Sequence, residues 1–129
     1  MNDTQMAAMR TALEERKSEI ERDVVSMDEE IRSIGEEQGD EKGGLGNHLA
    51  EDGSSVMEAV RLSTINGDLR EILTQVNGAL ERIDEGTFGT CQRCGKPIGE
   101  ERLEAVPYVR FCIECQTLLE REQALRTGH

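Results

Sequence analysis

The sequence predicts a mainly α-helical fold, in which a long antiparallel helical hairpin is followed by a small C-terminal module. Two stretches repeat apolar residues at alternating spacings of three and four, the period of packed helices. A glycine-rich stretch lies between them, where the chain can reverse direction. Aromatic residues make up only 2% of the 129 residues. We therefore expect stability to come from helix-on-helix seams rather than from a thick globular core.

The first helix is predicted over residues 3–34. Its seam positions are Met6, Arg10, Leu13, Lys17, Ile20, Val24, Met27, Ile31 and Ile34. One of the two alternating positions is apolar throughout, while the other is charged in the first half and apolar in the second. The surface between them is rich in Glu, Asp, Arg and Lys, as expected for a solvated helix face. This pattern is typical of a coiled-coil seam.

The second helix is predicted over residues 56–83. Its seam positions are Leu62, Ile65, Leu69, Ile72, Val76, Ala79 and Ile83. Ser55, with Glu58 three residues later, forms a capping-box pattern that predicts the start, and Gly86 is placed to end the helix. Gly67 and Gly78 lie inside this stretch, and each costs a helix about 1 kcal/mol relative to Ala.

The connection between the helices contains six glycines and is acidic. We predict a hairpin over residues 1–86 with a tip loop at about 35–54, followed by a second domain over residues 87–129. Carboxylates at such a tip could approach a basic cleft or a metal ion, although a solvated loop has the same composition. His48 is an isolated loop histidine, to which we assign no catalytic role.

The C-terminal part contains four cysteines, which form two Cys-x-x-Cys pairs separated by 17 residues. This spacing is typical of a zinc ribbon, and four thiolates suit a tetrahedral structural zinc ion. We therefore predict one zinc ion per chain, bound by Cys91, Cys94, Cys112 and Cys115.

Other uses of four cysteines fit less well. Disulfides are usual in small secreted chains, but Met1 is followed by polar residues rather than by an apolar signal sequence. A redox dithiol needs a single Cys-x-x-Cys, and a catalytic zinc needs an open coordination position. We expect a structural metal, reduced thiols and a cytoplasmic protein without enzymatic activity.

The charge distribution bears on possible partners. Residues 1–90 contain 9 Lys and Arg against 21 Asp and Glu, a net charge of -12, whereas residues 91–129 contain 6 of each and are neutral. Nucleic-acid binding draws on cationic side chains, so sequence-specific DNA binding is not expected. The acidic hairpin would be repelled by anionic membranes, and no apolar run approaches the length of a membrane-spanning helix.

The run from Ile83 to Pro107, followed by the second cysteine pair, resembles the zinc-finger signature of the DksA/TraR family. The shared features are a glycine before an aromatic-Gly-x-Cys run, then Cys-Gly-x-x-Ile and Arg-Leu-x-Ala-x-Pro. The resemblance implies a zinc module with a coiled-coil prong that binds RNA polymerase. It also implies that the tip of the prong enters the secondary channel and regulates transcription.

At the tip, the family pattern Asp-x-x-Asp-x-Ala corresponds to His48, Glu51 and Gly53, so only the acidic character of Glu51 is retained. We name His48, Glu51, Asp52 and Gly53 as the candidate partner-binding residues. No motif places a binding site for the alarmone ppGpp, whose involvement stays open. The alternative functions are a zinc-stapled adaptor for another protein partner and a DNA-binding zinc ribbon.

Apolar residues around the cysteines are predicted to form a small core; they are Phe88, Ile98, Leu103, Val106, Tyr108, Phe111 and Ile113. Leu118, Leu119 and Leu125 predict a C-terminal helix whose apolar face packs on the base of the hairpin.

Overall fold

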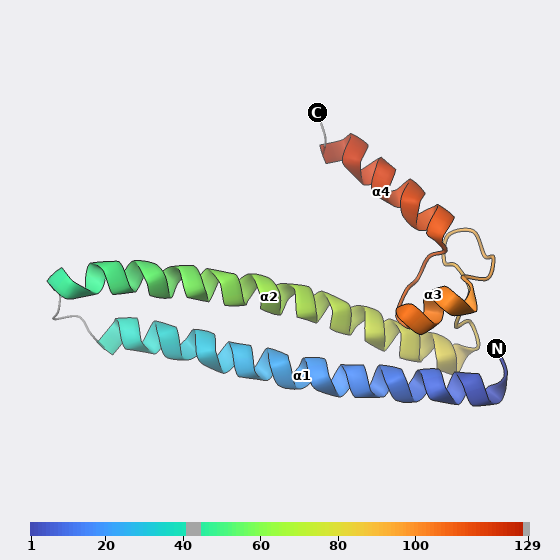
Figure 1. Cartoon of the computed structure of the whole chain (residues 1–129), viewed down its shortest axis with the longest axis horizontal. Helices are drawn as coiled ribbons and strands as arrows, with labels where there is room; N and C mark the ends of the chain where they lie inside the picture. The colour runs from blue at the N-terminus through green and yellow to red at the C-terminus, as the bar shows by residue number, and fades with distance from the viewer. Residues whose placement is uncertain (41–44, 128–129) are drawn as a thin grey trace. The chain divides into compact units, whose positions relative to one another are not determined.

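The computed structural model describes the backbone of residues 1–40 and 45–127, and the side chains of residues 1–36 and 53–127. The described residues form four helices, which are α1 (Asp3–Asp40), α2 (Leu45–Glu85), α3 (Glu100–Ala105) and α4 (Ile113–Thr127) (Figure 1). Over the described backbone, β-structure is limited to an isolated antiparallel bridge between Thr90 and Pro97. The predicted mainly α fold, with a helical hairpin, a four-cysteine module and a C-terminal helix, is confirmed.

The chain divides into two compact units. One combines Met1–Lys17 with Thr74–His129, and the other is Ser18–Leu73. Both long helices contribute to both units, so each unit contains its own stretch of paired α1 and α2. The domain boundary between residues 86 and 87 stays a prediction.

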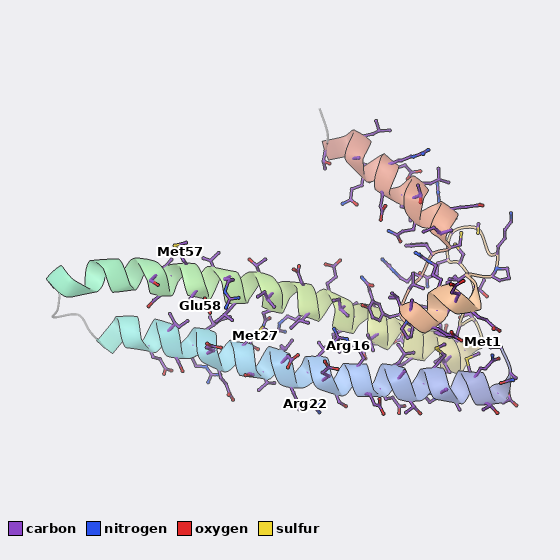
Figure 2. All side chains as sticks on the ribbon, in the orientation of Figure 1. Met1, Arg16, Arg22, Met27, Met57 and Glu58 are labelled. Atoms are coloured by element: carbon purple, nitrogen blue, oxygen red, sulfur yellow. The ribbon has the colours of Figure 1, made fainter. Side chains whose placement is uncertain are left out.

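The unit Ser18–Leu73 is held together by an apolar seam. Ile20, Val24 and Leu62 are buried between the paired helices. Hydrogen bonds join Asn66 to both Val24 and Asp28, and an ion pair of 2.7 Å joins Arg70 to Asp28. Away from the seam, Arg22 on α1 and Met57 on α2 point outward from the pair (Figure 2). The seam predicted from apolar spacing is therefore the buried face.

The unit that contains the chain's N-terminus begins with a reciprocal helix cap. The backbone N–H of Gln5 donates to the Asn2 side chain (2.8 Å), and the Asn2 N–H donates to the Gln5 side chain (2.9 Å). This arrangement is a capping box built from Asn and Gln. The helix pair then buries Leu13, Val76 and Ala79.

The connection between α1 and α2 is shorter than the sequence predicts. The expected tip loop of residues 35–54 is largely helical, since α1 extends to Asp40 and α2 begins at Leu45. Gly35 and Gly53 lie within these helices. A glycine raises the free energy of a helix by only about 1 kcal/mol. This cost is small enough for the surrounding helix-forming residues and helix pairing to offset.

The predicted capping box at Ser55 is therefore wrong, because Ser55 and Glu58 lie in the interior of α2. Glu58 instead accepts two hydrogen bonds from Arg61, three residues later, at 3.0 and 2.7 Å. Such i,i+3 pairs stabilise an exposed helix surface by a few tenths of a kcal/mol. Glu58, which suggested the start of a helix, thus pairs with a neighbouring residue on the surface of α2.

The end of α2 agrees with the prediction. Gly86 follows the last helical residue with φ of 82°, in the left-handed region. Its N–H donates to the Ile83 carbonyl at 3.3 Å, and the Thr87 N–H donates to the Arg82 carbonyl at 2.9 Å. These two bonds define a Schellman motif. Gly86 therefore turns the chain out of the helix toward the cysteine module.

The C-terminal helix is confirmed as an element, but its predicted packing is wrong. Leu119 is half-buried, but Leu118 is 44% exposed and Leu125 is 82% exposed, so the predicted apolar face of α4 is not covered by the base of the hairpin. A pattern of leucines identifies a helix with an apolar side but does not identify what covers it. Among the described residues, no helix has both the length and the apolar character needed to cross a bilayer.

Candidate metal centre and hairpin tip

The first cysteine pair sits in a tight turn. The Gly95 N–H donates to the Cys91 carbonyl at 3.0 Å, and the Cys91 N–H donates to the Lys96 carbonyl at 2.8 Å. Gly95 adopts φ of 76°, which a residue without a side chain tolerates best. The Thr90–Pro97 bridge closes the base of this turn. The sulfur atoms of Cys91 and Cys94 are thereby held on one loop.

The second pair lies at the start of α4. Cys112 directly precedes the helix, and its Sγ accepts a hydrogen bond from the Cys115 N–H at 3.5 Å. The Cys112 carbonyl accepts from the Gln116 N–H at 2.9 Å. The helix α4 thus begins directly after one candidate ligand, Cys112, and its first turn places the second, Cys115, beside it.

Backbone and side-chain hydrogen bonds connect the two turns. The Gln92 N–H of the first turn donates to the carbonyl of Arg110, at 3.0 Å. Arg102 of α3 donates through Nε to the Phe111 carbonyl, also at 3.0 Å. Neither α3 nor the bonding role of Arg102 was predicted, although Arg102 belongs to the Arg-Leu pair of the family signature. The hydrogen bond from Arg102 holds the backbone of Phe111, the residue just before Cys112.

The four sulfur atoms gather into one cluster. All of them lie within 4.8 Å of one another, and the Sγ atoms of Cys94 and Cys112 are 3.8 Å apart. Zinc bound tetrahedrally at about 2.3 Å per sulfur requires sulfur–sulfur separations of about 3.8 Å. A disulfide requires about 2.05 Å, and all four cysteines are free.

The predicted ligand set, Cys91, Cys94, Cys112 and Cys115, therefore fits one structural zinc ion. Four protein ligands complete a tetrahedral shell and leave no position for a substrate. When bound, the ion supplies a cross-link between the turn at Cys91 and the start of α4. Cys91 and Cys115 are buried, whereas Cys94 is exposed, so the cluster lies near one side of its module.

The local surroundings act in opposite directions on two of the thiols. Burial raises the pKa of Cys91, but hydrogen bonds from backbone N–H groups, including that of Cys94, outweigh it and lower the pKa to about 6. Burial and hydrogen bonds to the neighbouring cysteines raise the pKa of Cys115 to about 12. Zinc would displace the remaining protons, because a coordinating thiol is deprotonated. The site is thus partly prepared for a cation before metal binds.

The small core around the site is only partly as predicted. Phe88, Ile98 and Leu103 are buried, and Tyr108 and Phe111 are half-buried. Val106 and Ile113 are exposed instead of buried. We therefore expect both the metal and the burial of Phe88, Ile98 and Leu103 to stabilise this module.

The candidate tip residues are placed by the backbone alone. His48, Glu51 and Asp52 lie in the first turns of α2, and their side chains are outside the described residues. Gly53 follows them in the same helix and is exposed. Their role as a partner-binding site remains a prediction.

This architecture defines the class of the protein, a C4 zinc-finger protein with a helical hairpin. Comparison with known proteins then identifies the family and the relatives that this chain resembles. Residues 86–121 match the model of the prokaryotic dksA/traR C4-type zinc finger. The chain is 29% identical, over 99% of its length and 80% of the relative, to the RNA polymerase-binding transcription factor DksA of Escherichia coli strain K12. Residues 86–121 thus carry the zinc finger of the DksA/TraR family, and the chain is similar to DksA along nearly its whole length.

Two further similarities concern sequence and fold. General stress protein 16O of Bacillus subtilis is 36% identical over 79% of this chain, and the chain spans 63% of the length of that protein. The solved structure of transcription factor DksA2 from Pseudomonas aeruginosa superposes with a TM-score of 0.76 at 25% identity, covering 95% of this chain and 88% of DksA2. The fold is thus shared along nearly the whole chain.

Proposed function

We propose that this protein binds RNA polymerase and regulates transcription by inserting the tip of its α1–α2 hairpin into the secondary channel. One observation carries the proposal, namely the match to E. coli DksA, a relative named for polymerase binding, over 99% of this chain. The match includes both the zinc module and the hairpin. General stress protein 16O has a name that states no partner, so it supports membership of the family but not this function.

In this proposal, the two parts of the chain have different tasks. The zinc module holds the base of the hairpin and catalyses nothing, since its four thiolates complete the zinc shell. The first turns of α2 carry the carboxylates of Glu51 and Asp52 into the channel. There they change the electrostatic potential near the polymerase active region. The proposal also places the protein in the cytoplasm, where polymerase acts.

Two measurements on the zinc-loaded chain test the proposal. Affinity capture with core polymerase tests binding, and transcription in vitro tests regulation. The double variant Glu51→Ala, Asp52→Ala should retain capture and lose most of the effect on transcription. Removal of two charges alone could alter long-range attraction, so a matched control is needed. Glu14→Ala with Glu15→Ala removes the same charge from an exposed stretch of α1 and should behave as the unmodified chain.

Each result separates the proposal from its alternatives. Absence of polymerase capture would overturn it and favour an adaptor for another protein. Capture with no effect of the intact chain on transcription would overturn the regulatory part. Salt-sensitive binding to duplex DNA without polymerase would favour the DNA-binding ribbon. Equal loss of regulation in both double variants would remove the role of the tip.

A further inference from the structure

The two sides of α4 have different surroundings. One side faces its own module, where Cys115 is buried and Leu119 and Glu122 are half-buried. Glu122 on this side accepts a hydrogen bond of 2.9 Å from Arg93. The opposite side, which we call the outer face of α4, is exposed and consists of Ile113, Glu114, Thr117, Leu118, Arg121 and Leu125.

The outer face groups several apolar side chains that are open to solvent. Ile113 is 61% exposed, and Leu118 and Leu125 are exposed on the following turns. Val106, just beyond α3, is exposed as well, and it lines the same surface hollow as Ile113. Single exposed apolar residues are normal on proteins, whereas a group of them on one face marks an interaction surface. The outer face is therefore a candidate contact surface.

Two opposite charges indicate what binds there. Glu114 and Arg121 are seven residues apart, so they lie on the same line of the helix surface, about 10.5 Å apart along the axis. This distance is too long for them to pair with each other. When a second α4 runs antiparallel to the first, with a twofold axis beside Leu118, Glu114 of each copy lies opposite Arg121 of the other. The outer face is thus complementary to itself in charge.

We propose that the outer face of α4 binds the same face of a second copy of this chain, as an antiparallel dimer. In this register, Leu118 of the two copies meet near the axis. Leu125 of each copy reaches the start of the other α4, where Ile113 is exposed. The two pairs of Glu114 with Arg121 fix the register around this apolar centre.

The charge distribution favours a dimer through this module rather than through the hairpin. Residues 91–129 have no net charge, whereas residues 1–90 have a net charge of -12. The other exposed apolar group, Val56, Met57 and Val60 on α2, lies in the acidic part of the chain, where two copies repel each other. The dimer does not depend on polymerase binding.

The size of the contact sets the expected affinity. A single helix pair buries less than the roughly 1,200 Å² of stable complexes, so we expect a dissociation constant of about 10–100 μM. Analytical ultracentrifugation of the zinc-loaded full chain, from about 5 μM to about 1 mM, measures it. The mean mass should rise from that of one chain toward that of two. A mass that stays at one chain throughout would overturn the proposal and leave the outer face to a different protein.

Charge reversal tests whether the outer face is the contact. Glu114→Arg leaves only cations at the two paired positions, and Arg121→Glu leaves only carboxylates. Each variant alone should therefore self-associate at least about tenfold more weakly. An equal mixture of the two should form dimers again, because both contacts then join opposite charges. Glu71→Arg on the exposed surface of α2 is the matched control for Glu114→Arg and should dimerise as the unmodified chain.

Leu118→Asp provides a second disruption that leaves the neighbour of the zinc ligand Cys115 unchanged. It places two carboxylates beside the axis and should also weaken the dimer at least about tenfold. Zinc content and circular dichroism establish that each variant is folded. Self-association that these variants leave intact would assign the contact to another surface and overturn the proposal. Failure of the mixed charge variants to associate would overturn the antiparallel register.

Discussion

The side-chain nitrogen of Asn66 donates a hydrogen bond to the backbone carbonyl of Val24 on the facing helix, at 3.3 Å. The same nitrogen donates to Oδ1 of Asp28 at 3.0 Å, and the Asn66 oxygen accepts from Nε of Arg70 at 2.6 Å. Asn66 is buried in an otherwise apolar seam. A single polar residue of this kind specifies the register of paired helices, at a cost in stability.

Asn66→Ala should lower the free energy of unfolding by about 1–3 kcal/mol, because it leaves the donors and acceptors around Asn66 without their buried partner. Urea unfolding followed by circular dichroism would measure the change. Asn77→Ala is the matched control, since Asn77 lies in the same helix and is half-buried. If both variants unfold alike, the polar cluster contributes nothing specific to the hairpin.

Removal of zinc should loosen the metal module and spare most of the helical content. Metal analysis should find about one zinc per chain, and Cys112→Ser should reduce this content because three thiolates remain. Tyr108 is the only tyrosine and there is no tryptophan, so its fluorescence reports on this module alone. Chelation should change that fluorescence. An unchanged signal and an unchanged thermal midpoint after complete chelation would contradict a structural metal.

Acid should release the zinc from the four-cysteine site. The pKa of Cys91 is lowered to about 6 in the folded chain, so its thiolate persists as pH falls from neutrality and is lost below that value. Protons compete with the metal for thiolates, so affinity decreases as pH decreases. We expect zinc to be retained at neutral pH and released progressively as the pH is lowered, because protonation of the four thiols opposes metal binding. A zinc-sensitive dye would measure the release, and zinc content that does not change on acidification would contradict this prediction.

One glycine inside α2 and the glycine that follows α2 should respond in opposite directions to alanine. Gly86 adopts φ of 82°, and Gly86→Ala should lower the free energy of unfolding by about 1–2 kcal/mol. Gly67 is exposed inside the helix with no atom within 4 Å of an added Cβ. Gly67→Ala should therefore raise the free energy of unfolding by about 0.5–1 kcal/mol. Thermal unfolding of the two variants compares them directly, and changes of the same sign would contradict the assigned cap.

The seam and the metal site could be predicted because each depends on a regular spacing. The period of apolar residues identified the buried faces at Leu13, Ile20 and Val76, and the cysteine spacing identified the four ligands. Gly86 was predictable as well, because a left-handed helix end strongly favours glycine. These features follow from local geometry.

The errors have equally physical causes. Gly35 and Gly53 suggested a long loop, but the small cost of each glycine does not end a helix that is otherwise well paired. Asn66 was missed because an apolar pattern cannot indicate a buried polar residue whose partners on the facing helix lie more than 35 positions away in sequence. The exposure of Leu125 was missed because burial depends on what packs against a helix, and no local pattern encodes that.

Backbone hydrogen bonds constrain the short segment from Gly86 to Cys91. The N–H groups of Thr87 and Phe88 both bond to Arg82, while those of Thr90 and Cys91 bond to Thr87 and Lys96. Insertion or deletion of one residue here would break this series, whereas the paired arms could gain or lose matched heptads and keep their seam. During evolution, related chains should therefore vary in arm length and conserve the number of residues between the helix end and the first cysteine.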